Sequence, residues 1–224
     1  MAGGFRGALT LLSCFLLTSA ALWGATPSPW GVVVASNRAR ISDSNADVGA
    51  NVYDTDQLST EGPGSLQVRS SEAQLYLAGS TDATLMAAGP TPCASLLFGT
   101  AIFSTRRGSS FGLCVGNVRV YPQSVAPVIG QVTMVSSKEL LVSSRRGSLA
   151  VIVGNQTQIV PQGTSYRVFL DSPGGPEDAQ GPGPGGPKRL NAVRRPRFTI
   201  VASTATAIIT GFAIDEVFES PDKP

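Results

Sequence analysis

The sequence predicts a mainly β protein, and three observations support this fold class. Between residues 30 and 170, short runs rich in Val, Ile, Leu, Tyr and Thr alternate with Gly, Asn, Asp and Ser. In segments 65–69 and 73–77, apolar and polar side chains alternate, as in a strand with one buried face. An internal similarity at an offset of 39 residues indicates stacked, equivalent turns of sheet.

Thirteen segments of this body are expected to be strands because each is a short apolar or alternating run bounded by turn-forming residues. They are Gly31–Ala35, Asn51–Tyr53, Ser65–Arg69, Gln74–Leu77, Thr84–Ala87, Ala101–Ser104, Phe111–Val115, Asn117–Tyr121, Gly130–Val135, Glu139–Ser143, Leu149–Val153, Thr157–Val160 and Tyr166–Leu170. A short helix is expected between Thr91 and Phe98, since Pro92 suits a first helical turn.

The internal similarity centres on two basic turns. Ser-Thr-Arg-Arg-Gly-Ser at residues 104–109 recurs as Ser-Ser-Arg-Arg-Gly-Ser at residues 143–148. The matches then continue with Gly116-Asn117 to Gly154-Asn155 and Pro122-Gln123 to Pro161-Gln162. A constant offset favours a true repeat. Chance similarity among short strands is the alternative.

Residues 1–25 have the composition of a secretory signal peptide. Arg6 precedes an apolar run from Ala8 to Trp23, and small residues and prolines follow that run. The body, residues 30–170, is therefore expected to be exported. An uncleaved N-terminal anchor is the alternative.

A second uncharged segment, Phe198 to Ile214, lies near the C-terminus. Its 17 residues reach the lower limit for a membrane-spanning helix. We therefore predict a transmembrane helix at residues 198–217, through which the chain contacts the membrane, and a tail at residues 218–224. A core helix or strand of the body is the alternative.

Between the body and this segment, residues 171–197 form a basic tract rich in Gly and Pro. Such a composition cannot bury an apolar face, so a disordered linker is predicted. Arg194, Arg195 and Arg197 precede the apolar segment, and basic residues favour the cytoplasmic side of a membrane. A cytoplasmic body is therefore the alternative topology.

The composition excludes several classes of function. Histidine is absent, which excludes Ser–His and Cys–His nucleophile systems and zinc sites that need imidazole. The formal charge of +2 does not favour a nucleic-acid partner. No phosphate-binding loop or cluster of metal ligands is evident, so no catalytic residue, cofactor or metal is expected. A carboxylate-based glycan-active enzyme is the enzymatic alternative.

Two sets of residues are candidates for structural or binding roles. Cys93 and Cys114 are 21 residues apart and suit a disulfide in an oxidising compartment, with two buried free thiols as the alternative. The matching pairs Arg106/Arg107 and Arg145/Arg146 suit contacts with an anionic polysaccharide, a lipid or an acidic protein. Solvated turn arginines are the alternative for these pairs.

The paired carboxylates of Asp54 and Asp56 belong to a predicted turn. We expect their side chains to accept hydrogen bonds from nearby backbone amides. A calcium site or an acid/base pair is the alternative.

The N-terminal part of the body carries a recognisable order of motifs. Val52–Thr60 contains Asp-x-Leu-x-Thr, and Gly64–Arg69 and Ala73–Leu77 follow as two amphipathic segments. In this order, the stretch from Gly31 to Leu85 resembles the FecR-like β domain, although Thr55 stands where that family usually has glycine. The resemblance implies a twisted, roll-like or solenoid-like β domain on the outer side of the inner membrane of a bacterium.

The resemblance also bears on partners. FecR-like regulators carry a cytoplasmic segment that controls a sigma factor, whereas seven residues precede the first apolar run here. No sigma-factor contact is therefore expected, and the chain resembles short members with a signal peptide and a C-terminal anchor. The expected function is a non-enzymatic cell-envelope protein, periplasmic or at the cell surface, that binds an unknown envelope protein or polysaccharide. A self-assembling structural protein is the alternative.

Overall fold

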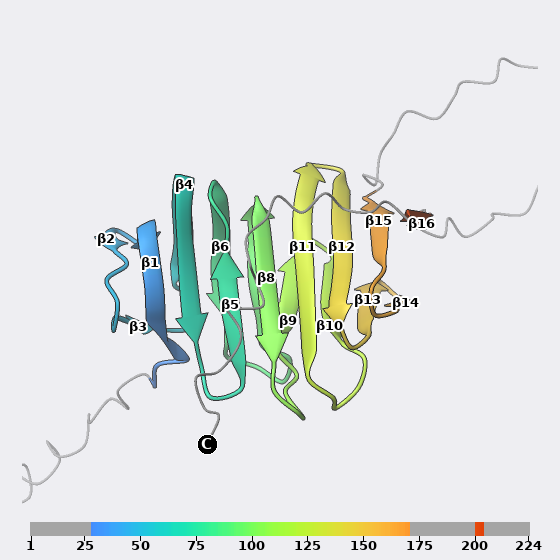
Figure 1. Cartoon of the computed structure of the whole chain (residues 1–224), viewed down its shortest axis with the longest axis horizontal. Helices are drawn as coiled ribbons and strands as arrows, with labels where there is room; N and C mark the ends of the chain where they lie inside the picture. Colours follow the sequence, from blue (N-terminus) through green and yellow to red (C-terminus); the bar gives the residue numbers. More distant parts are fainter. Residues whose placement is uncertain (1–27, 171–199, 204–224) are drawn as a thin grey trace, which may run out of the picture.

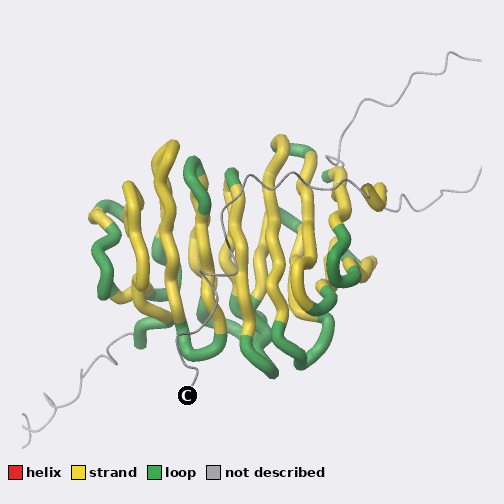
Figure 2. Tube along the Cα trace, in the orientation of Figure 1, coloured by secondary structure: helices red, strands yellow, loops and turns green. Residues whose placement is uncertain are grey.

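The computed structural model describes residues 28–170 and 200–203, and these residues form sixteen β-strands without a helix (Figures 1 and 2). The predictions for residues 1–25, 171–197 and 218–224 lie outside the described residues. The strands are β1 (Gly31–Ile41), β2 (Ser44–Asn45), β3 (Asn51–Val52), β4 (Gln57–Arg69), β5 (Ala73–Leu77), β6 (Thr81–Met86), β7 (Cys93–Phe98), β8 (Thr100–Thr105), β9 (Gly112–Val115), β10 (Val118–Pro122), β11 (Val128–Ser136), β12 (Glu139–Arg146), β13 (Leu149–Val153), β14 (Gln156–Val160), β15 (Ser165–Phe169) and β16 (Ile200–Ser203).

All described strands belong to one sheet that turns back on itself to form a two-layered roll (Figure 1). The front layer has the order β1-β4-β5-β8-β11-β12-β15-β16, and the back layer has the order β6-β7-β9-β10-β13-β14. Every described pairing is antiparallel except that of β7 with β9, which is parallel. The short strands β2 and β3 pair only with β1. The mainly β prediction is confirmed.

Strand β4 carries the chain from one layer to the other. Its first residues, Gln57–Thr60, pair with β6, and its last, Leu66–Arg69, pair with β5. Between these halves lies Gly62-Pro63-Gly64, where a Cβ on Gly64 would come 2.7 Å from the carbonyl oxygen of Asn37 on β1. Glycine is therefore required for the close approach of β1 to this corner.

One hydrophobic core lies between the two layers, because alternate side chains of both layers point inward. The front layer contributes Leu75, Leu77 and Phe103, each fully buried, and the back layer contributes Leu113 and Val151. This alternation is the pattern that predicted the strands, and each of the thirteen predicted segments overlaps an observed strand.

The helix expected between Thr91 and Phe98 is wrong. Cys93–Phe98 is strand β7, which pairs with β6 on one side and with β9 on the other. Pro92 lies just before the strand, where the ring needs no hydrogen-bond donor, and its carbonyl oxygen accepts a bond from the N–H of Gly112 at 3.1 Å. Two ladders of hydrogen bonds therefore override the local signal for a helix.

The segment predicted as a transmembrane helix is described only at Ile200–Ser203. These four residues form β16, which pairs with β15 at the edge of the front layer. The rest of residues 198–217 lies outside the described residues. Within the described ranges, no helix has the length and apolar character needed to cross a membrane.

The internal similarity corresponds to two equivalent modules of four strands. The first module, β8–β11, and the second, β12–β15, each consist of a front strand, a hairpin in the back layer and a second front strand. Gly116 and Gly154 begin the two hairpin turns with φ values of 56° and 57°, as glycine does in a type II′ turn. The structure thus places the two copies in equivalent positions.

Candidate functional site

The turn around Asp54 and Asp56 is held together by its own carboxylates. Asp54 Oδ1 accepts hydrogen bonds from the N–H groups of Ala88 at 3.0 Å and Ala87 at 2.6 Å, and these bonds lower the pKa of Asp54 below its usual value of 3.8. Asp56 Oδ2 accepts a bond from the N–H of Tyr53 at 2.8 Å. Both carboxylates thus bind backbone amides, as the structural interpretation predicts.

A disulfide joins Cys93 on β7 to Cys114 on β9, with the two Cα atoms 6.0 Å apart. Cys93 faces Gly112 in the parallel ladder, and Ser95 faces Cys114, so the bond links both ends of this short pairing. Tyr121 lies beside it, and its hydroxyl donates to the carbonyl oxygen of Thr91 at 3.3 Å. The disulfide therefore fixes the segment that leads into β7.

The two arginine pairs lie at the same end of the front layer. β8 and β12 are both antiparallel to β11, and Ile129 on β11 faces Ser104 on one side and Arg146 on the other. The turns after β8 and β12 therefore lie two strand spacings apart, which is about 10 Å. We name the four side chains the basic ridge: Arg106, Arg107, Arg145 and Arg146.

The guanidinium groups of the basic ridge have no partner within the part of the chain that the structure describes. The ion pair found there joins Arg167 to Glu139 at 2.8 Å, near the opposite end of β12. Arg106, Arg107 and Arg146 are exposed, and the Nε atom of half-buried Arg145 is buried without a hydrogen bond. Four cationic groups are thus available to a ligand.

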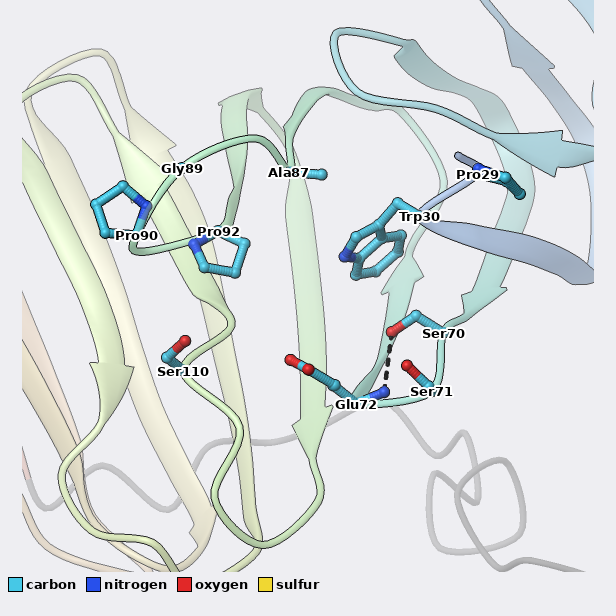
Figure 3. A pocket seen from close by; sticks show the side chains of 10 residues that line it. All are labelled: Pro29, Trp30, Ser70, Ser71, Glu72, Ala87, Gly89, Pro90, Pro92 and Ser110. Atoms are coloured by element: carbon cyan, nitrogen blue, oxygen red, sulfur yellow. Dashed lines mark hydrogen bonds between the residues drawn. The ribbon is translucent and has the colours of Figure 1, made fainter. Parts of the chain in front are cut away.

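A pocket of about 410 Å³ opens beside the basic ridge (Figure 3). Trp30 and the Ser70–Glu72 turn form one side of it, and Gly89–Pro92 and Ser110 form the other. The two sites are adjacent, because the carbonyl oxygen of Glu72 accepts a hydrogen bond from the N–H of Arg106 at 3.0 Å.

Both sides of the pocket are anchored to the body. The ring of Trp30 packs on buried Phe111, with ring centroids 4.8 Å apart and an interplanar angle of 33°. In the turn, Ser70 Oγ accepts hydrogen bonds from the N–H groups of Glu72 at 3.3 Å and Ala73 at 3.0 Å. On the opposite side, the disulfide follows directly after Pro92. The pocket is therefore preformed.

Sequence reasoning missed the pocket, because its lining comes from separate loops. Pro29 and Trp30 precede the first strand, and Glu72 and Ser110 belong to turns far along the chain. The one available signal was a tryptophan beside a proline outside any alternating pattern. Across residues 28–170, no three His, Cys, Asp or Glu side chains gather where they could hold a metal ion.

Comparison with known proteins gives limited information. No protein-family model matches the chain, and no curated protein matches it. Two crystal structures, at 2.50 Å and 1.65 Å resolution, of a "putative anti-sigma factor" from Parabacteroides distasonis share 15% sequence identity with it at a TM-score of 0.43. Each match covers 50% of this chain and 54% of the other, so the chain spans about half the length of these structures. At this TM-score the likeness supports no argument, and membership of the FecR-like family stays a prediction.

Proposed function

We propose that the protein is a non-enzymatic cell-envelope protein whose β roll binds an anionic polysaccharide through the basic ridge. The observation that carries this proposal is the convergence of four unpaired arginines at one end of the front layer. Arginine is suited to this role because its planar guanidinium group donates paired hydrogen bonds to carboxylate and sulfate groups.

Export of the body and its attachment to a membrane are parts of the same proposal. The Cys93–Cys114 disulfide supports export, because such bonds persist in oxidising compartments and are rare in the cytosol. The signal-like composition of residues 1–25 supports it independently. The apolar stretch from Phe198 to Ile214 supports attachment at the C-terminal side of the body.

The lining of the pocket supports binding rather than turnover. Glycoside hydrolysis commonly uses two carboxyl groups between about 5 and 9.5 Å apart. The pocket beside the basic ridge is lined by one carboxylate, that of Glu72. The other closely spaced pair, Asp54 and Asp56, is occupied by backbone amides.

Binding of polygalacturonate tests the basic ridge, with the fully methyl-esterified chain as an uncharged polymer of the same backbone. We expect the full-length protein in mild detergent to bind polygalacturonate in a salt-dependent manner and to bind the ester much more weakly. Replacement of all four ridge arginines by glutamine should weaken binding at least about 100-fold, since each charge-assisted contact contributes about 1.5 kcal/mol or more.

The matched control changes the same number of charges away from the ridge. Arg38, Arg40, Arg119 and Lys138 are exposed and lie outside the two basic turns. Their joint replacement by glutamine should leave the affinity within about threefold of wild type, because only local contacts differ. Equal losses in the two quadruple variants would contradict a specific ridge.

Self-assembly is the second candidate, and an uneven distribution of charge favours it. Strands β1–β6 and their loops carry three arginines and seven carboxylates: Arg38, Arg40, Arg69, Asp43, Asp47, Asp54, Asp56, Glu61, Glu72 and Asp82. Strands β8–β15 carry seven cations and one carboxylate: Arg106, Arg107, Arg119, Lys138, Arg145, Arg146, Arg167 and Glu139. Sedimentation of the same variants separates the two candidates, because self-assembly through the ridge would give wild-type oligomers that dissociate in the ridge variant.

A further inference from the structure

We propose that the pocket beside the basic ridge binds one neutral sugar unit of the polysaccharide, with the ring stacked on Trp30. This inference rests on the proposed function and names the part of the ligand that enters the fold. A sugar ring has an apolar face and a polar edge, and the pocket offers an indole for the face and hydroxyl and carboxylate groups for the edge.

Trp30 is held as a flat platform. Phe111, which is 1% exposed, packs against its ring, and the Trp30 N–H donates to the carbonyl oxygen of Val52 at 2.8 Å. Figure 3 shows the indole at the side of the pocket opposite Pro90 and Pro92. The apolar contact therefore needs no rearrangement on binding, which lowers its entropic cost.

Three polar groups on the lining remain available to a ligand. The carboxylate of Glu72 and the hydroxyls of Ser71 and Ser110 are exposed and make no side-chain hydrogen bond within the described residues, whereas the hydroxyl of Ser70 is used within its turn. Figure 3 shows the Glu72 carboxylate directed into the space between the two sides. Together they offer both acceptors and donors, as sugar hydroxyls require.

The charges around the pocket favour a neutral ligand. A cation stacked on Trp30 would meet Glu72, but it would also lie beside Arg106 and Arg107 of the basic ridge. An anionic group inside the pocket would meet the Glu72 carboxylate. A neutral unit in the pocket and an anionic unit on the ridge satisfy both sites along one polymer.

Trp30 also provides the test, because the chain contains two tryptophans and Trp23 lies in the predicted signal peptide. Trp23→Phe in the full chain leaves Trp30 as the only tryptophan. Titration with neutral trisaccharides of glucose, galactose, mannose and N-acetylglucosamine should give a saturable change in its fluorescence for at least one of them. Glu72→Gln should weaken that binding about tenfold or more, because a carboxylate accepts stronger hydrogen bonds than an amide.

The matched control is Glu61→Gln, which changes an exposed glutamate far from the pocket and should leave trisaccharide binding unchanged. The ridge variant should also retain it, since a neutral trisaccharide does not need the arginines. Failure of all four trisaccharides, or a response to tetramethylammonium alone, would overturn the inference. Trisaccharide binding without polygalacturonate binding would instead overturn the proposed function and leave the pocket assignment standing.

Discussion

At the scale of single residues, Thr55 occupies a position suited to glycine. Its φ angle is 69°, in the left-handed region, which a β-branched side chain adopts at a cost. Its N–H donates to the carbonyl oxygen of Leu85 at 2.8 Å, and its neighbours Asp54 and Asp56 bind backbone amides on either side. The surrounding hydrogen bonds therefore hold Thr55 in its strained conformation.

We predict that Thr55→Gly stabilises the protein by up to about 1 kcal/mol. Glycine removes the steric cost of the left-handed conformation, which is about 1–2 kcal/mol, and loses part of that gain to its greater freedom in the unfolded chain. Urea unfolding followed by far-ultraviolet circular dichroism measures the difference. The control Thr157→Gly, on exposed strand β14, should destabilise the protein instead, and a loss of stability at both positions would contradict the strain.

At the scale of elements, the β7–β9 pairing shows where prediction from sequence stops. Hairpins such as β9–β10 and β13–β14 follow from local signals, alternating side chains around Gly-Asn turns, and the sequence predicts them. Strand β7 depends instead on partners that lie on β6 and β9, and no local pattern identifies a parallel pairing. The pocket escapes prediction for the same reason, since separate loops assemble it, whereas the basic ridge lies within a repeated motif.

The disulfide should be a principal support of β7. Loss of both cysteines in Cys93→Ala/Cys114→Ala frees a loop with a sequence separation of 21 residues, and we expect a loss of about 3 kcal/mol in the free energy of unfolding. Denaturant unfolding of the variant measures this loss, and wild-type protein in reducing agent should reproduce it. Trisaccharide affinity should fall as well, because Gly89–Pro92 would lose its nearest anchor. Unchanged stability in the double variant would mean that the hydrogen-bond ladders alone hold β7.

At the scale of the whole molecule, the two modules suggest that the roll tolerates the removal of a complete module. Deletion of residues 104–142 joins equivalent points of the two modules and removes 39 residues, one repeat length. With Cys93→Ala to avoid an unpaired thiol, we expect a shorter roll that unfolds in one cooperative transition by circular dichroism. Deletion of residues 107–126 removes only the β9–β10 hairpin and leaves Phe103 uncovered, so that variant should aggregate. Equal behaviour of the two deletions would contradict modularity.

The modules also fix the spacing at which the protein can contact a long ligand. Each module ends its first front strand with one arginine pair, and successive pairs lie about 10 Å apart along the edge of the roll. A chain with a third module would present a third pair at the same interval. Such a protein would gain affinity by multivalency for a polymer whose charges recur at that interval and gain little for one whose charges do not. The number of modules would thus determine how long a stretch of polymer is measured, and the strand spacing would determine which charge period is selected.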